Sequence, residues 1–406
     1  MNKKVFLIIN QTALPGERSL TRTMTLYSML KEKGDDVTII TSAFNHYDKK
    51  IRNKESFFKE YPDWKVVFID EPGYTKNVSV KRIYSQCVFA LNLRKWFKGS
   101  ADHCDVVFMT VPTYEGAAFV GKICNTRHIP YIVNVEDIWP EAMSLFIKPR
   151  FLYELLTFPL KRTADKVYKQ ANGFTAVSQE YLERAQKSNT KAKKHAVVYL
   201  GASLELFDKG AVQYAKIVQK QKQEFWIAYI GTLGESYDIR TFIDAVTYLN
   251  RNGYPDIKAK ILGRGPAELK LRQYAEQNKT GIEFVGFLPY EKMAGYLVNC
   301  DLMINAIKKS ASQSVVNKVS DYFASGKPVL NGCVQKEMRA LIDDYQTGIN
   351  YEPENEESLI NAIVKLYQAP EQCAQLGNNG RKLAEELFDR KNSYKQFIEM
   401  IDTIEA

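Results

Sequence analysis

The stretch Lys4-Val5-Phe6-Leu7-Ile8-Ile9-Asn10 opens the chain with a continuous apolar run that ends at a polar residue. A strand that is apolar at every position is buried on both faces, which is typical of a parallel sheet covered by helices. After a loop containing Pro15-Gly16, helical periodicity runs from residue 20 to a stop at Gly34, and a second apolar run follows at Val37–Ser42. This alternation predicts an α/β unit.

The same alternation recurs along the chain of 406 residues. The further strands that we expect in the first half are Val66–Asp70, Val106–Val111, Tyr131–Val135, Phe174–Val177 and Val197–Leu200. A polar stretch rich in Lys and Gln ends near Glu224, and a second series of strands follows at Trp226–Ile230, Ala259–Leu262, Ile282–Val285, Leu302–Ala306, Val329–Asn331 and Ile349–Tyr351. We therefore predict two doubly wound domains, residues 1–207 and 208–387, and a C-terminal helical segment, residues 388–406, that returns to the first domain.

Composition points to a soluble globular protein, because 45% of the residues are hydrophobic and 25% are charged. The N-terminus lacks the features of a signal peptide, and no apolar run is long enough to span a bilayer, so we expect a cytosolic protein. The six cysteines show no C-x-x-C spacing and the four histidines show no metal-ligand spacing. No Asp-x-Asp pair occurs either, so we expect no bound metal.

The net charge of +9 is concentrated in the first half of the chain. Basic residues cluster within residues 76–98 and again within residues 146–169, where they alternate with large apolar side chains. Such a mixture suits an anionic membrane surface. A solvated basic face is an equally good interpretation of any one cluster, and both interpretations stay open.

The most specific motif is Asn317-Lys318-x-x-Asp321-Tyr322-x-Ala324-x-Gly326-x-Pro328-Val329. We expect a helix over Val315–Ala324 whose first turn, Ser314, Val315 and Val316, offers free backbone N–H groups to a pyrophosphate. Asp321 can accept hydrogen bonds from ribose hydroxyls, and Lys318 can place a charge near phosphate. The alternative is an ordinary amphipathic helix capped by Ser312.

This motif resembles the donor-binding signature of the retaining family 4 glycosyltransferases, most closely the branch found in bacterial capsule and exopolysaccharide clusters. Matching pieces elsewhere in the chain are Gly231-Thr232-Leu233, Tyr237-Asp238-Ile239, Gly263-Arg264-Gly265-Pro266 and Asp137-Ile138-Trp139-Pro140-Glu141. The resemblance implies the GT-B fold, in which two Rossmann-like domains face a central cleft and the donor binds the second domain.

The resemblance also implies roles for single residues. It puts Leu288 at the edge of the base, and Asp321 at the place of a glutamate that binds ribose. Gln313 falls where the family has a second glutamate, near the donor sugar. Arg264 and Lys318 are the cations left to contact the diphosphate, while Thr232 and Tyr237 occupy the stretch where relatives carry an Arg and a Lys. Gly16 in the first loop, like Gly231 in the second domain, would let the backbone approach the donor.

In the first domain, Asp137 follows the buried strand Tyr131–Val135. A carboxylate at this edge can receive the proton of the acceptor hydroxyl or orient that hydroxyl, and Glu136 beside it can share the role. The alternative is that Asp137 caps the next helix.

The function that the resemblance implies is transfer, with retention, of a hexose or N-acetylhexosamine from a nucleotide diphosphate sugar, UDP being favoured. The acceptor would be lipid-linked or a polysaccharide in bacterial surface glycan synthesis. We expect no cofactor, no metal and no nucleic-acid partner, and a place on the inner face of the cell membrane. A nucleotide-sugar 2-epimerase of the same fold and a non-catalytic sugar-nucleotide-binding partner stay open as alternatives. A nicotinamide dehydrogenase does not, because neither half contains G-x-G-x-x-G after its first strand.

Overall fold

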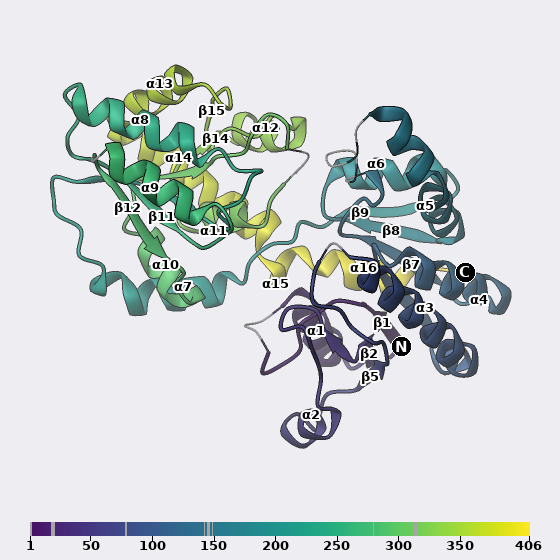
Figure 1. Cartoon of the computed structure of the whole chain (residues 1–406). Coiled ribbons are helices and arrows are strands. Elements are labelled where there is room, and N and C mark those ends of the chain that lie inside the picture. Colours follow the sequence, from purple (N-terminus) through teal and green to yellow (C-terminus); the bar gives the residue numbers. More distant parts are fainter. Residues whose placement is uncertain are drawn as a thin grey trace. The chain divides into compact units, whose positions relative to one another are not determined.

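A computed structural model describes residues 2–17, 21–77, 79–141, 143, 147, 149–278, 280–311 and 315–406 (Figure 1). The chain divides into two compact units, which are unit 1, Met1–Tyr199 with Tyr394–Ala406, and unit 2, Leu200–Ser393. Unit 2 thus begins at Leu200 rather than at residue 208. Helix α7 (Leu204–Tyr214) belongs to it because α7 packs on α10 (Tyr290–Leu297), so closely that a Cβ on Gly210 would lie 2.5 Å from Glu291 Cα.

Unit 1 contains a seven-stranded parallel sheet with the strand order β5-β2-β1-β6-β7-β8-β9. Its strands are β1 (Lys4–Ile8), β2 (Asp36–Ser42), β5 (Val66–Ile69), β6 (Val106–Val111), β7 (Tyr131–Val135), β8 (Gly173–Ala176) and β9 (Lys194–Val197). A small antiparallel pair, β3 (Phe44–Asn45) and β4 (Lys50–Ile51), follows β2. The parallel sheet that the continuous apolar runs predicted is therefore present.

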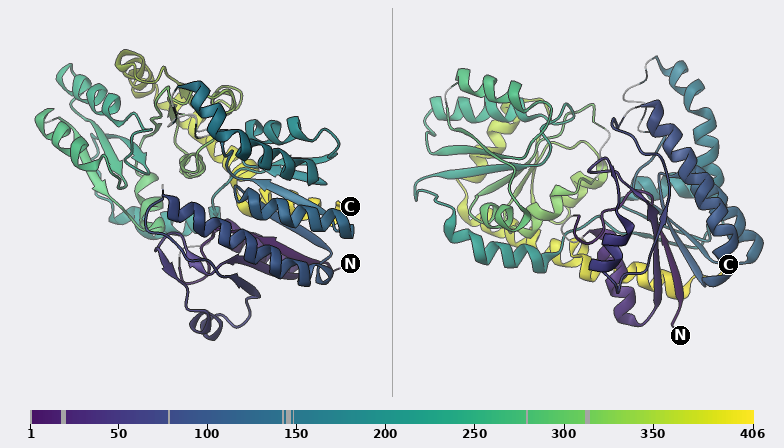
Figure 2. Two further views of the ribbon diagram at one scale, coloured as in Figure 1. Left: turned by 45° about the vertical axis from the view of Figure 1, so that its right-hand side comes forward. Right: turned by 60° about the horizontal axis from the view of Figure 1, so that its bottom comes forward.

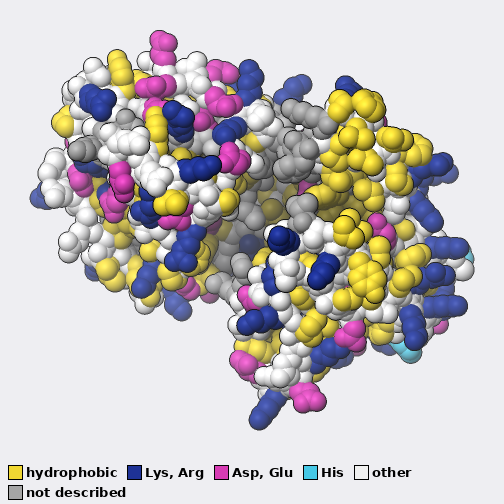
Figure 3. Space-filling model, in the orientation of Figure 1, with side chains coloured by type: hydrophobic (Ala, Val, Ile, Leu, Met, Phe, Trp, Pro, Cys, Tyr) yellow, Lys and Arg dark blue, Asp and Glu magenta, His cyan; other side chains and the backbone are white. Residues whose placement is uncertain are grey.

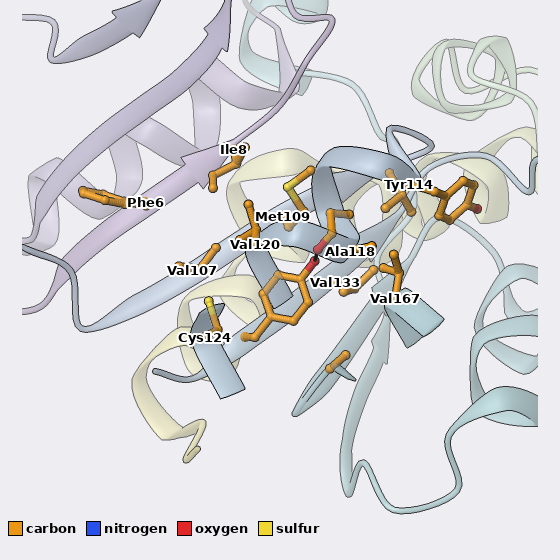
Figure 4. Close-up of a cluster of buried hydrophobic side chains, with 14 of the residues drawn as sticks. Phe6, Ile8, Val107, Met109, Tyr114, Ala118, Val120, Cys124, Val133 and Val167 are labelled. Atoms are coloured by element: carbon orange, nitrogen blue, oxygen red, sulfur yellow. Dashed lines mark hydrogen bonds between the residues drawn. The ribbon is translucent and has the colours of Figure 1, made fainter. Parts of the chain in front are cut away.

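Helices cover both faces of this sheet (Figure 2). On one face lie α3 (Val80–Ser100), α4 (Tyr114–Arg127) and α5 (Arg150–Gln170), which share a buried core with β6 and β7. Figure 4 shows Val107, Met109 and Val133 from the sheet against Val120 and Cys124 from α4. The opposite face packs against α1 (Arg22–Lys33) and the C-terminal α16 (Lys395–Thr403). The short helices α2 (Lys54–Glu60) and α6 (Gln179–Ser188) complete the unit.

Strand β9 lies three residues earlier than the sequence predicted. The apolar run starting at Val197 indicated a strand at Val197–Leu200, but the pairing with β8 matches Gly173 with Lys194 and ends with Ala176 opposite Val197. β9 is an edge strand whose side chains are half-buried or exposed. Its residues therefore lack the apolar signature that located the interior strands.

Unit 2 repeats the architecture with a six-stranded parallel sheet in the order β12-β11-β10-β13-β14-β15. Its strands are β10 (Phe225–Ile230), β11 (Ile257–Leu262), β12 (Ile282–Gly286), β13 (Leu302–Asn305), β14 (Val329–Asn331) and β15 (Gly348–Asn350). Its further helices are α8 (Ile239–Arg251), α9 (Glu268–Asn278), α11 (Lys318–Ala324), α12 (Lys336–Asp343), α13 (Glu356–Tyr367), α14 (Pro370–Leu383) and α15 (Arg390–Ser393).

In each sheet the strand order reverses once, between β1 and β6 and between β10 and β13. Ligands of doubly wound sheets bind outside the carboxyl ends of the strands at such a reversal. In unit 2 the pairing of β10 with β13 covers only Ile227–Leu302 and Ala228–Met303. Beyond this pairing, the Tyr322 hydroxyl accepts a hydrogen bond from Ile230 N at 2.9 Å and donates one to Ile304 O at 3.0 Å. Tyr322 therefore anchors α11 where the two strands separate.

We predict that Tyr322→Phe destabilises unit 2. The substitution leaves the N–H of Ile230 and the C=O of Ile304 buried without a partner, at a cost of about 1–3 kcal/mol each. Urea unfolding should show a lower free energy of unfolding, and hydrogen exchange at the Ile230 amide should be faster.

Tyr351→Phe is the matched control, because the Tyr351 hydroxyl is buried and has no hydrogen-bond partner among the described residues. Its removal should change stability by less than about 1 kcal/mol. Equal losses in the two variants would contradict a bridging role for Tyr322.

Candidate functional site

Two glycine loops meet at the carboxyl ends of the neighbouring strands β10 and β11. Leu233 N donates to Arg264 O at 2.9 Å. A Cβ on Gly263 would lie 1.8 Å from Gly231 O, and one on Gly265 would lie 2.2 Å from Leu233 O. Glycine is therefore required at both positions by the close approach of the two backbones. The two loops thus form one side of the place where the strand order of unit 2 reverses.

Lys318 lies beside these loops and is unusual for a lysine because it is buried. Its side chain is buried, with 8% of the residue exposed, and Nζ lies 4.0 Å from the ring centroids of both Tyr229 and Tyr237. Nζ has no hydrogen-bond partner among the described residues, and burial lowers the pKa of Lys318 well below its usual value. An unpaired buried ammonium is costly, and an anion beside it would offset that cost.

The buried amine is directed towards the backbone of the β10 loop. A Cβ built on Gly231 would lie 3.7 Å from Lys318 Nζ, and Gly231 itself is exposed with a φ of +128°. Tyr237 is fixed in place because the loops after β10 and β13 are joined by a bridge between Tyr237 and Ile307. The structure thus places Gly231 and Tyr237 beside the Lys318 amine, and their contacts with a phosphate group stay predictions.

Helix α11 begins at Lys318, three residues later than the sequence predicted. Val315 and Val316, both half-buried, precede it in non-helical backbone, and the chain enters the helix through tight turns in which Val319 N donates to Val316 O. The expected first turn at Val315 is therefore wrong. Gln313 and Ser314, which we proposed near the sugar and the pyrophosphate, lie outside the described residues.

The late start of α11 places Asp321 in its first turn. Tyr290 Oη donates to Asp321 Oδ1 at 2.8 Å, and burial raises the pKa of Asp321 to about 6. Tyr290, the first residue of α10, therefore orients this carboxylate. The other carboxylate oxygen, Oδ2, has no hydrogen-bond partner in the described part of the chain. Asp321 can therefore still accept a hydrogen bond from a hydroxyl.

The other predicted donor contacts surround this centre. Arg264 is exposed, and its guanidinium lies 5.4 Å from the Phe287 ring. Leu288 is half-buried in the loop after β12, and Thr232 is exposed while its carbonyl accepts a hydrogen bond from the Tyr229 hydroxyl at 2.7 Å. Their proposed contacts with base and diphosphate stay predictions.

The first loop of unit 1 is held by an arginine that the sequence did not single out. Arg52 donates to both carboxylate oxygens of Glu17, at 2.6 and 2.9 Å, and to the carbonyls of Ser42 and Thr12, each at 2.6 Å. Gly16 has a φ of +82°, and a Cβ there would lie 2.6 Å from the Tyr61 hydroxyl. The loop thus needs glycine at this position, while the proposed approach to a phosphate stays a prediction.

Asp137 and Glu136 follow β7 and have different partners. Asp137 Oδ2 accepts a hydrogen bond from Trp139 Nε1 at 2.7 Å, and burial raises the pKa of Asp137. Glu136 Oε1 accepts from Asn134 Nδ2 at 3.0 Å and pairs with Arg22 at 3.6 Å. The alternative that Asp137 caps the next helix stays a prediction, because several residues between Asp137 and α5 lie outside the described part of the chain. A carboxyl group with a raised pKa suits proton transfer.

Sequence reasoning missed Tyr229 and the structural task of Tyr322. Tyr229 is fully buried in β10, so the continuous apolar run concealed it. A signal was available for Tyr322, because it follows Lys318 by four residues and therefore shares its helix face.

Among the described residues, no group of three or more His, Cys, Asp or Glu side chains is arranged to hold a metal ion. Independence from metal stays a prediction.

Part of the chain is similar to a known protein family. Residues 213–383, which lie in unit 2, match the family model "Glycosyl transferases group 1". The uncharacterized glycosyltransferase MJ1069 of Methanocaldococcus jannaschii is 22% identical over 267 residues, which are 65% of this chain and 67% of the relative.

Solved structures resemble the whole chain. The crystal structure of Anabaena Alr3699/HepE in complex with UDP has a TM-score of 0.70 at 16% identity, over 99% of this chain and 100% of that one. Sucrose-phosphate synthase (tll1590) from Thermosynechococcus elongatus has a TM-score of 0.73 at 15% identity, over 98% of each chain. At these identities the likeness concerns the fold alone.

The fold is thus GT-B, built from two Rossmann-like domains, as the sequence predicted. Residues 213–383 are in addition similar to the group 1 glycosyltransferases. The comparisons do not favour the 2-epimerase or the non-catalytic partner.

Proposed function

We propose that this glycosyltransferase transfers a hexose or N-acetylhexosamine, with retention, from a UDP-sugar held by unit 2 to an acceptor held by unit 1. The observation that carries the proposal is the buried Lys318 ammonium, unpaired among the described residues, beside the exposed backbone of Gly231. A donor diphosphate is the anion that a group 1 glycosyltransferase must bind, and Lys318 supplies a charge for it.

Each part of the donor has a partner in unit 2. Asp321 accepts hydrogen bonds from the ribose hydroxyls, and the loop that contains Leu288 contacts the base. UDP is favoured by the sequence resemblance and by the UDP bound to Alr3699/HepE. No metal enters this scheme, because Lys318 and Arg264 carry the positive charge.

The chemistry breaks the bond between the anomeric carbon and the diphosphate oxygen and forms a bond from that carbon to the acceptor oxygen on the same face. The departing diphosphate takes up the acceptor proton. Negative charge grows on the diphosphate during bond breaking, and the nearby ammonium of Lys318 stabilises it. Asp137 orients the acceptor hydroxyl in unit 1.

We also propose that unit 1 binds the inner face of the cell membrane, where surface glycans are built on lipid carriers. Helices α3 and α5 expose large apolar side chains, which Figure 3 shows gathered on one side with Lys and Arg around them. On α5, Phe151 is 72% and Leu155 69% exposed, and the Arg162 guanidinium lies 5.3 Å from the exposed Phe158 ring. Among the described residues, no helix has the length and apolar character needed to cross a bilayer.

Lys318→Met should weaken binding of a UDP-sugar about 10–100-fold while leaving the protein as stable as before or more stable. Binding weakens because the substitution removes a charge-assisted contact worth about 1.5–3 kcal/mol. Stability does not fall because the substitution also removes a buried amine that has no partner among the described residues. Isothermal titration calorimetry and thermal unfolding measure the two effects. Lys327→Met is the control, because Lys327 is another lysine whose pKa burial lowers, at the amino end of β14.

The same titration should reveal proton uptake. Burial lowers the pKa of Lys318 in the free protein, and the donor diphosphate raises it again, so a proton binds with the donor at pH values between the two pKa values. Affinity should therefore fall as pH rises through that window. Heats that do not vary between buffers of different ionisation enthalpy, at every pH tested, would contradict the role of Lys318.

Asp321→Asn and Asp137→Asn should affect different kinetic constants. Asp321→Asn should raise the donor KM about 10-fold, because an amide is a weaker acceptor for ribose hydroxyls, whereas Asp137→Asn should lower kcat by about 10²-fold or more. Since burial raises the pKa of Asp321 to about 6, wild-type kcat/KM for the donor should fall as pH decreases through 6. A nucleotide-release assay in which Asp321→Asn keeps this acid limb would rule out the assignment.

Leu155→Glu with Phe158→Glu should weaken flotation with phosphatidylglycerol vesicles about 10-fold or more, because two exposed apolar contacts with the bilayer are lost. The matched control is Val212→Glu with Leu269→Glu, since these apolar residues of unit 2 are 81% and 68% exposed. Equal flotation of both pairs of variants would place the membrane surface elsewhere.

A further inference from the structure

Two cations at the carboxyl edge of the unit 1 sheet share one neutral partner. Lys49 Nζ donates to Asn77 Oδ1 at 2.6 Å, and Arg82 Nη1 donates to Asn77 O at 2.8 Å. Both also lie near the Tyr74 ring, with Nζ of Lys49 at 4.9 Å and the guanidinium carbon of Arg82 at 5.7 Å from its centroid. The two positive charges are therefore close to each other.

Polar groups from the neighbouring loops complete the cluster. Tyr74 is 5% exposed, and its hydroxyl lies 2.5 Å from His46 Nδ1 and accepts a hydrogen bond from Gln11 Nε2 at 2.9 Å. Gln11 follows β1, Tyr74 follows β5, and His46 and Lys49 lie in the turn between β3 and β4, the small hairpin after β2. The cluster is thus built from the loops at the carboxyl ends of three strands, where doubly wound units bind ligands.

The positive charge of the cluster is poorly balanced. Within the described part of the chain, no carboxylate lies at ion-pair distance from Lys49 or Arg82. Arg82 is near enough to lower the pKa of Glu71 and Asp137, but Glu71 is occupied by the hydroxyls of Ser42 and Ser85, and burial raises the pKa of both carboxyl groups.

Helix α3 adds to this positive charge. It is 21 residues long, it is capped by Ser79, and its first turn contains no acid but the two cations Lys81 and Arg82. A helix carries partial positive charge at its N-terminus, where acids are usually favourable and cations are not. Two independent features, the paired cations on Tyr74 and the helix end, therefore favour an anion at this place.

Apolar side chains follow the cluster directly along α3. Val80 is 82%, Ile83 63% and Tyr84 62% exposed. A ligand with an anionic head and an apolar tail would match both features, with the head at Lys49 and Arg82 and the tail along the start of α3.

We infer that Lys49, Arg82 and the N-terminus of α3 bind the phosphate or diphosphate group of a lipid-linked acceptor. This inference rests on the proposed function and specifies it, because it assigns the acceptor a phosphorylated lipid carrier rather than a free polysaccharide end. The two cations are held in position by the Tyr74 ring, and the Tyr74 hydroxyl is in turn fixed by Gln11 and His46.

The test measures binding of geranyl diphosphate by equilibrium dialysis, with the donor site saturated with UDP. Wild-type protein should bind one equivalent, and Lys49→Gln with Arg82→Gln should bind it at least 10-fold more weakly. The control is Lys95→Gln with Lys98→Gln, which removes two exposed cations from the far half of α3 and should leave binding unchanged. Lys49→Arg, which keeps the charge, should retain binding and shows that loss in the Gln pair is not a folding defect.

Two further probes separate the possible sources of the phosphate. Inorganic pyrophosphate should bind the same site more weakly than geranyl diphosphate, because it lacks the tail. If the Gln pair loses flotation with phosphatidylglycerol vesicles but keeps geranyl diphosphate, the cations contact membrane headgroups and the inference is overturned. It is also overturned if wild-type protein binds no diphosphate beyond UDP. Failure of UDP itself to bind would instead refute the proposed function of unit 2.

Discussion

The Tyr322 hydroxyl is the contact on which the donor site depends, because it occupies the place where β10 and β13 stop pairing. Strands that separate leave buried N–H and C=O groups without partners, and a side chain must supply them. Tyr322 does so from α11. The same contact fixes the rotation of that short helix, so Lys318, four residues earlier, is directed to the β10 loop and Asp321 to Tyr290. One hydroxyl group thus satisfies the separated strands and also orients the helix that carries Lys318 and Asp321.

The Lys318 side chain shows how stability is given up for function. Its amine is surrounded by two tyrosine rings, which offer an attractive face to a cation but no hydrogen-bond acceptor. Burial without a partner is unfavourable in the free protein, and the glycine loops prevent the site from collapsing onto the amine because their backbones are already in contact. A diphosphate would therefore enter a rigid site in which the amine that takes up the balancing proton is already in position.

Much of the fold could be predicted from the sequence, because the buried parallel strands β1, β6, β7 and β10 are continuous apolar runs. Prediction failed where that signal is absent or misleading. The edge strand β9 is not fully apolar, and Val315 and Val316 have helical spacing with α11 but lie in turns before it. Lys318 and Asp321 were found through their motif. The partners that define their chemistry, Tyr229 and Tyr290, come from distant strands and loops, and no local pattern in the sequence connects them.

The two sheets share one strand order, but the cations at their carboxyl edges differ in burial and in hydrogen-bond partners. Unit 2 places a single buried amine at the reversal point, which suits one small anion in a fixed position. In unit 1, Lys49 and Arg82 are half-buried, paired only with neutral groups, and adjacent to exposed apolar side chains of α3. Half-exposed cations are stabilised by water and need no ligand to be tolerated, so they can receive and release a large amphipathic molecule. A repeated architecture would thus suit one edge to the proposed donor and the other to the proposed acceptor, which must leave after transfer.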